Sequence, residues 1–144
     1  MDRTVVRGVA TLMLSVFAIG CGEDPSDSGG VTKNLVTGVV REWSVEVDAT
    51  SAMAGEVTFT VTNDGTIGHE FLVVKTDFES GRIPLDGDRF PEPTEGVEVV
   101  DEIGEFPKGT TETLTVDLEP GKYQLVCNLP GHYAAGMHTA FEVR

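Results

Sequence analysis

The sequence has few basic residues, cysteines and histidines, and these shortages exclude several classes of protein. Its 144 residues hold 10 Lys and Arg against 24 Asp and Glu, for a formal net charge of −14. Nucleic acid and anionic lipid are poor partners for so acidic a chain. Two interpretations of the acidity stay open: it keeps a small protein soluble and monomeric, or it suits a basic protein partner. At this length we expect one domain with one hydrophobic core.

No apolar run is long enough for a permanent membrane span, which takes about 20 residues. The run at 9–19 is shorter and follows Arg3 and Arg7, a profile typical of a signal peptide. Residues 1–20 are therefore predicted to be a signal peptide that directs export. Asp2, Arg3 and Arg7 sum to +1, so removal of this segment takes the net charge from −14 to −15.

Cys21 directly follows the predicted signal peptide. The small residues before it resemble the lipobox of bacterial lipoproteins, which implies that Cys21 carries lipid and anchors the protein in the bacterial cell envelope, outside the cytoplasm. A free thiol, or a disulfide with Cys127, is the alternative. Residues 22–30 have no apolar side chain, and we interpret 21–33 as a flexible, lipid-anchored linker.

Residues 34–144 show the pattern of β-strands, in which β-branched and apolar residues alternate with polar ones. Val57, Phe59 and Val61, for example, share one face. No stretch predicts an amphipathic helix of useful length, so we expect an all-β fold, an antiparallel Greek-key β-sandwich in one domain. The predicted strands lie at about 35–41, 43–49, 55–62, 69–75, 111–118, 122–127 and 138–143.

The strand pattern lapses between about residues 76 and 110, which are rich in Pro, Gly and acidic residues. From Asp77 to Glu105 there are ten acidic residues against Arg82 and Arg89, a net charge of −8. We expect a long acidic excursion from the sandwich. It is either an ordinary solvated loop or a docking surface for a basic partner, because long loops in compact domains are often functional.

The residues that carry chemistry lie mainly in one short segment, 127–137. It places the thiol of Cys127, the imidazole of His132 and the thioether of Met137 at even spacing between two predicted strands. Thiolate and thioether suit Cu(I) and imidazole suits either oxidation state, so this mixture favours a redox copper site. One loop cannot surround a metal, and His69, at the start of a predicted strand, is the further ligand that we expect.

Each of these residues also has a plainer interpretation. Met137 could fill the core, and His69 could be a hydrogen-bonded strand histidine. Zinc is an alternative to copper, because imidazole and thiolate bind it well. The third histidine, His138, is expected on the surface, since strand alternation turns it away from Met137.

With these ligands, the strand-forming region resembles the blue copper proteins, or cupredoxins. Four residues separate Cys127 from His132 and four separate His132 from Met137, which looks more like auracyanin and rusticyanin than like plastocyanin or azurin. The resemblance implies that His69, Cys127 and His132 form a trigonal ligand set. It also implies Met137 as a weak axial ligand, with the carbonyl of Gly68 on the opposite side.

The resemblance implies a function as well: one copper ion, cycling between Cu(I) and Cu(II), carries single electrons between redox proteins of the cell envelope. Electrons would pass through the ring edge of His132 within an apolar patch. A copper-holding or copper-delivery protein with the same ligands is the alternative, and a metal-free sandwich that binds a protein or glycan is another. Catalysis is not expected, because only His138 is left for a second copper centre. The candidate patch residues are Leu129, Pro130, Tyr133, Ala134 and Ala135.

Glu70 departs from the family pattern, in which an asparagine often follows the first histidine and helps to donate hydrogen bonds near the cysteine sulfur. An ionised Glu only accepts hydrogen bonds. We hypothesise that Glu70 points away from the sulfur and bonds donors of the ligand loop. Because groups around the ligands tune a metal, we expect Glu70 to affect the reduction potential rather than the ligand set.

Overall fold

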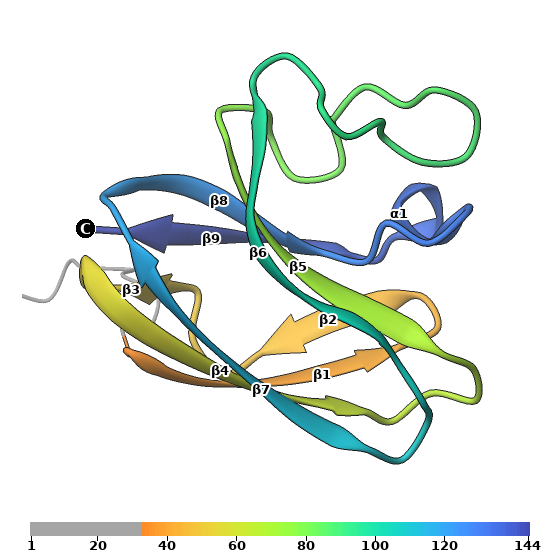
Figure 1. Cartoon of the computed structure of the whole chain (residues 1–144), viewed down its shortest axis with the longest axis horizontal. Helices are drawn as coiled ribbons and strands as arrows, with labels where there is room; N and C mark the ends of the chain where they lie inside the picture. The colour runs from red at the N-terminus through yellow and green to blue at the C-terminus, as the bar shows by residue number, and fades with distance from the viewer. Residues whose placement is uncertain (1–32) are drawn as a thin grey trace, which may run out of the picture.

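The computed structural model describes residues 33–144, which form a sandwich of two β-sheets (Figure 1). The predicted signal peptide, Cys21 and residues 22–32 of the predicted linker lie outside the described residues. Within the described part, no helix has the length and apolar character needed to cross a membrane. The elements are β1 (Leu35–Arg41), β2 (Ser44–Val47), β3 (Ser51–Ala52), β4 (Gly55–Asn63), β5 (His69–Thr76), β6 (Val97–Phe106), β7 (Thr111–Leu118), β8 (Gly121–Val126), α1 (His132–Ala135) and β9 (His138–Val143).

The two sheets have the strand orders β2-β1-β4-β7 and β3-β9-β8-β5-β6. The predicted all-β sandwich is confirmed, but the sheets are mixed, because β1 pairs with β4 and β3 pairs with β9 in parallel. Parallel neighbours need a longer connection than a hairpin. Here β2 and β3 lie within that connection: the chain leaves the first sheet after β2, joins the second at β3 and returns to the first at β4.

The main core lies between the two sheets. Alternation along β4 turns Val57, Phe59 and Val61 inward, and none of the three is exposed to solvent. The neighbouring β7 turns Leu114 and Leu118 to the same side, where they join the same apolar cluster. Each buried side chain of this size contributes about 1.5–3 kcal/mol. The inward faces of the strands therefore carry much of the stability that holds the site in place.

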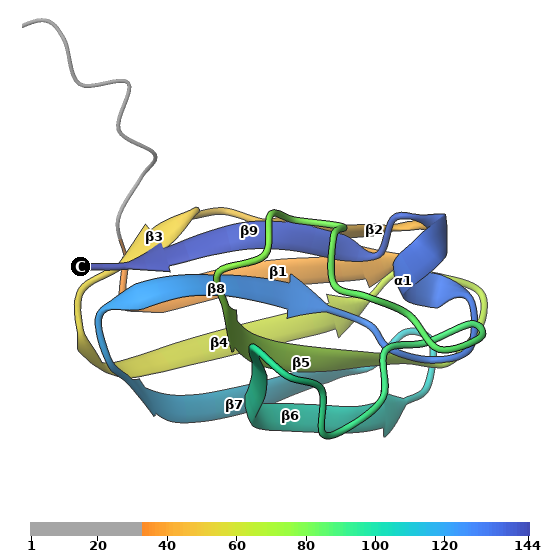
Figure 2. The ribbon, with the colours of Figure 1, turned by 90° about the horizontal axis from the view of Figure 1, so that it is seen from above.

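β5 is buried on both faces, which its sequence does not reveal by alternation. One set of its residues points into the main core, and the residues between them belong to a second apolar cluster. The loop 77–96 covers this second cluster and runs across the outer face of β5 and β8 toward α1 (Figure 2). The second cluster consists of Leu72, Val74, Ile83, Phe90, Val126 and Tyr133.

The predicted excursion is a loop only in its first half. In its second half β6 pairs antiparallel with β5 and forms the edge of its sheet, so residues 97–106 belong to the sandwich and not to the predicted excursion. Charged side chains are common on edge strands because they discourage pairing with other chains. In β6 they obscure the strand pattern. The exposed acidic residues of β6 are Glu98, Asp101, Glu102 and Glu105.

Candidate metal centre

Three of the predicted ligands come together at one end of the sandwich. His69 is the first residue of β5, Cys127 follows the last residue of β8, and His132 is the first residue of α1. Because β5 and β8 are antiparallel neighbours, the start of one strand lies beside the end of the other. The ligand loop, residues 127–137, then brings His132 back to the same end.

Backbone hydrogen bonds close the ligand loop. The N–H of Cys127 donates to the carbonyl of Met137 at 3.0 Å, and the N–H of Met137 donates to the carbonyl of His132 at 3.1 Å. Gly136 has a φ of 122°, in the region that favours glycine, and a Cβ there would lie 3.0 Å from the carbonyl oxygen of Trp43. The loop therefore holds its three potential ligands close together.

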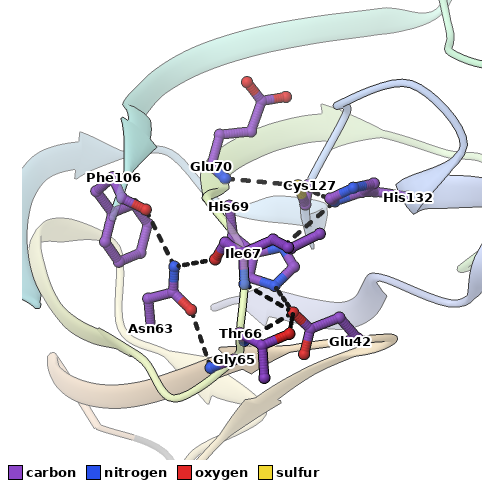
Figure 3. Close-up of polar contacts among 10 residues, drawn as sticks. All are labelled: Glu42, Asn63, Gly65, Thr66, Ile67, His69, Glu70, Phe106, Cys127 and His132. Atoms are coloured by element: carbon purple, nitrogen blue, oxygen red, sulfur yellow. Dashed lines mark hydrogen bonds and ion pairs between the residues drawn. The ribbon is translucent and has the colours of Figure 1, made fainter. Parts of the chain in front are cut away.

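The donor atoms of the three residues converge (Figure 3). His132 Nδ1 lies 3.3 Å from His69 Nδ1 and 3.4 Å from Cys127 Sγ, and the donor atoms of all three residues lie within 4.8 Å of one another. His69 and Cys127 are fully buried, and His132 is 8% exposed. A thiol and two imidazoles are the strong ligands of blue copper sites. The three residues are positioned to bind a single copper ion.

Burial decides the protonation of all three groups, because it disfavours the charged form. It lowers the pKa of His69 and of His132, and for His132 the neighbouring His69 adds to the effect. It raises the pKa of the Cys127 thiol to about 11. Both imidazoles are therefore neutral near pH 7, whereas the thiol has to release a proton before it binds a metal.

Of the two predicted axial groups, Gly68 adjoins His69 in the chain, and Met137 ends the ligand loop, where its carbonyl accepts the N–H of Cys127. Met137 is fully buried in the same apolar cluster as Cys127. Gly68 immediately precedes His69 and packs against the side chain of Glu105, with which an added Cβ would collide. The assignment of Met137 and Gly68 as axial ligands stays a prediction.

Glu70 contacts the ligand loop through both its backbone and its side chain. Its backbone N–H donates to Cys127 Sγ at 3.5 Å, while its carboxylate points away from the sulfur (Figure 3). The carboxylate accepts a hydrogen bond from the N–H of Asn128 at 2.7 Å. Burial raises the pKa of Glu70, and the bond from Asn128 opposes that rise. The side chain of Asn128 bonds both the N–H and the carbonyl of Phe90, which ties the loop 77–96 to the ligand loop.

Sequence reasoning missed Glu42, which lies behind His69. Its Oε1 accepts hydrogen bonds from the N–H groups of Thr66 and Ile67, at 2.8 and 3.0 Å, and from the Thr66 hydroxyl. These bonds, first that from the Thr66 N–H, lower the pKa of Glu42 to about 2. Glu42 Oε1 also lies 3.5 Å from His69 Nε2. No local pattern marks the contact, since 24 residues separate Glu42 from Thr66.

The apolar patch predicted around His132 is only partly at the surface. Tyr133 is 2% exposed, so its place in the patch is wrong: its ring packs edge-on against Phe90, and its hydroxyl donates to Gln124 at 2.8 Å. The four-residue helix turns this side chain inward, which loop patterning did not predict. Leu129 is half-buried, and the exposed members are Pro130, Ala134 and Ala135.

Two other rings complete the surroundings of His132. Trp43, for which sequence patterns indicate no role, is 50% exposed, and its ring lies edge-on to that of His132 with centroids 5.3 Å apart. His138 is outside the three-residue group and is half-buried rather than free on the surface. Its Nδ1 lies 2.8 Å from the hydroxyl of Ser80.

A β-sandwich that brings two histidines and a cysteine together in this way defines a single-copper protein. The family model described as copper binding proteins, plastocyanin/azurin family, matches residues 41–144. The chain belongs to this family. No curated protein matches the chain.

Solved structures share the fold at low sequence identity. Reduced auracyanin from the photosynthetic bacterium Roseiflexus castenholzii is 22% identical, with a TM-score of 0.59 over 79% of this chain and 99% of that one. Rusticyanin from Thiobacillus ferrooxidans is 23% identical, with a TM-score of 0.50 over 82% and 87%. An azurin from Methylomonas sp. strain J is 15% identical, with a TM-score of 0.54 over 76% and 97%. These likenesses confirm the predicted fold relationship to auracyanin and rusticyanin.

Proposed function

We propose that this protein is a type 1 (blue) copper protein that carries single electrons between redox partners in the cell envelope. The observation that carries the proposal is the convergence of His69, Cys127 and His132, with donor atoms within 4.8 Å of one another in a buried site. Thiolate and imidazole together accommodate both Cu(I) and Cu(II). Met137 and the carbonyl of Gly68 would be weaker additional ligands of the ion.

Electrons pass through His132, the only one of the three ligands with measurable exposure. Trp43 stands beside it, and the exposed Pro130, Ala134 and Ala135 extend the apolar surface. A small apolar contact suits a redox partner that has to bind and leave quickly.

The partner has a basic docking surface. The acidic side chains of β6 and the loop before it carry a net charge of −8 between residues 77 and 105. Charge of one sign on one part of a protein attracts an oppositely charged partner, and dissolved salt screens that attraction. Electron exchange with the partner should slow as ionic strength rises. A rate independent of salt would remove the steering role.

The protein acts as a monomer in the bacterial cell envelope, after export by the signal peptide 1–20. A lipid on Cys21 anchors it to the membrane, and residues 21–33 are the linker. The support for this placement is the sequence before residue 34. A Cys21→Ser variant should leave the membrane fraction and appear in the soluble fraction of the envelope, with its copper site unchanged.

Electron transfer is favoured over catalysis by the small number of metal ligands. Besides the two ligand histidines, the described residues contain only His138, which bonds Ser80. A copper-delivery protein would use the same ligands but would release copper to an acceptor. An electron carrier should keep its copper and cycle rapidly between Cu(I) and Cu(II).

Colour tests the copper site directly. Purified protein given Cu(II) should turn intensely blue or green through thiolate-to-copper charge transfer and should give a reversible voltammetric wave. Cys127→Ser should stay colourless, whereas the matched variant Cys21→Ser should keep the colour. Zinc preference would show as displacement of copper without colour. A colourless wild-type protein would contradict the proposal.

A further inference from the structure

Among residues 33–144, one buried nitrogen of His69 has no hydrogen bond. The ring is 0% exposed, its Nδ1 faces the other two ligands, and its Nε2 has no hydrogen-bond partner in this part of the chain. A neutral imidazole carries a proton on one nitrogen and a lone pair on the other. If the proton sat on Nδ1, it would point at His132 Nδ1, 3.3 Å away, and the lone pair would face away from the metal site. Something has to favour the other tautomer.

Glu42 is the group that faces Nε2, and the structure holds it firmly. Its Oε1 lies 3.5 Å from Nε2 and accepts the hydrogen bonds from Thr66 and Ile67 described above. The turn that supplies these donors packs closely on the contact: a Cβ on Gly65 would lie 2.8 Å from His69 Nε2 and 3.0 Å from each carboxylate oxygen of Glu42. The carboxylate therefore has little freedom to turn away from the ring.

We propose that Glu42 is a positioning residue for His69: it keeps the proton on Nε2, so that Nδ1 presents its lone pair to copper, and it favours Cu(II) over Cu(I). A carboxylate on the far nitrogen of a ligand histidine fixes the tautomer and raises the basicity of the ligand. Its negative charge also stabilises the more positive oxidation state. The effect on copper rests on the function proposed above, whereas the effect on the tautomer does not.

The tautomer is measured in the copper-free protein by nitrogen-15 NMR of the histidine rings. Wild-type His69 should be in the Nε2–H form. Glu42→Ala removes the acceptor and should give a mixture of both forms, with a loss of roughly tenfold or more in Cu(II) affinity. An Nδ1–H form in the wild type, or an unchanged tautomer in Glu42→Ala, would overturn the proposal.

The reduction potential tells whether Glu42 acts through its direct contact with His69 or only as a nearby negative charge. Glu42→Gln keeps an oxygen for the Thr66 and Ile67 donors, so it should fold even where Glu42→Ala does not. It should raise the potential. Glu105→Gln is the matched control, because Glu105 also acts electrostatically on His69 but makes no hydrogen bond or ion pair with it. Equal shifts in the two variants would reduce Glu42 to a background charge and contradict the proposal.

The two parts of this inference fail separately from the copper proposal. If the wild-type protein bound no copper, the proposed function would be wrong, but the NMR measurement would still decide whether Glu42 sets the tautomer. If copper bound with the expected colour and the tautomer proved independent of Glu42, only this inference would be lost.

Discussion

Both sides of the metal site are held by a carboxylate, but the two carboxylates are held differently. Behind the histidine of β5, Glu42 accepts hydrogen bonds from three donor groups of the turn 63–68. Beside the ligand loop, Glu70 accepts one, from the N–H of Asn128. The first carboxylate is fixed by its surroundings, and the second links two segments.

The pKa values show which physical effect dominates on each side. Hydrogen bonds lower the pKa of Glu42 to about 2, so its charge persists under all ordinary conditions. Burial raises the pKa of Glu70, because a single hydrogen bond does not offset the loss of water around the carboxylate. Glu42 therefore ionises easily because several donors outweigh its slight burial, whereas Glu70 has one donor against deeper burial and the nearby charges of Glu102 and Glu92.

The largest expected effect is on the turn that holds Glu42. Buried Asn63 donates hydrogen bonds to the carbonyls of Ile67 and Phe106 and accepts one from the N–H of Gly65 (Figure 3). Asn63→Ala leaves these backbone groups without partners, which should lower the free energy of unfolding by about 3 kcal/mol or more. Chemical denaturation of the copper-free protein measures this change.

Asn34→Ala is the matched control for that change. The Asn34 side chain also makes three hydrogen bonds to backbone, two to carbonyls and one from an N–H, but at an exposed position where water can replace them. Its loss should cost only about 1 kcal/mol. If Asn63→Ala and Asn34→Ala lost the same stability, burial would not explain why the hydrogen bonds of Asn63 matter more to the fold.

The second expected effect is a smaller change in stability. Removing the negative charge should stabilise the protein at Glu70 and destabilise it at Glu42. Glu70→Gln keeps an oxygen for the Asn128 N–H and removes a charge that burial disfavours. At neutral pH it should stabilise the copper-free protein by less than about 1 kcal/mol, while Glu42→Gln should destabilise it. Thermal unfolding of both variants tests the contrast, and the same sign in both would break it. With copper bound, Glu70→Gln should raise the reduction potential slightly.

Sequence predicts the parts of the fold and site that depend on local pattern. Alternation along 55–62 identifies β4 and its buried face, and the spacing of soft ligands in 127–137 by itself indicates copper chemistry. His69 is expected as a ligand because a loop cannot enclose a metal alone. The strand prediction is confirmed, and His69, Cys127 and His132 lie close together as expected. Strand faces and loop spacing can be predicted because they are set within a few residues.

The remaining features depend on which segments meet in space. The strand pattern of β6 is missed because its acidic edge obscures the apolar residues that face the sheet. The parallel pairings arise from the crossing of the chain between sheets. Glu42 and Asn128 contact residues that are far away in the sequence, and no sequence spacing predicts such contacts. Local pattern places Tyr133 on the surface because the helix that turns it inward is a single turn.

A third carboxylate, that of Asp48, lies far from the ligands. We expect its removal to change stability least, which makes it a reference for Glu42 and Glu70. Asp48 lies at the opposite end of the β1–β2 hairpin from Glu42, bonds Lys33 at 2.7 Å and accepts the N–H of Thr37 at 2.8 Å. The bond to Lys33, first, and that to Thr37 lower the pKa of Asp48 below 3.8. Its ionised form therefore stabilises the fold above that pH, and the stabilisation disappears as pH falls through the lower, folded pKa.

Asp48→Asn should accordingly destabilise the protein at neutral pH by less than about 1 kcal/mol, because the pair is exposed and screened by water. The difference in unfolding temperature from the wild type should shrink as the pH drops below 3.8 and be smallest in strong acid. Asp117→Asn, on the exposed face of β7, is the control, because the described contacts give its side chain no hydrogen bond or ion pair. A pH-independent difference for Asp48→Asn would mean that packing, rather than its charge, makes this carboxylate useful to the fold.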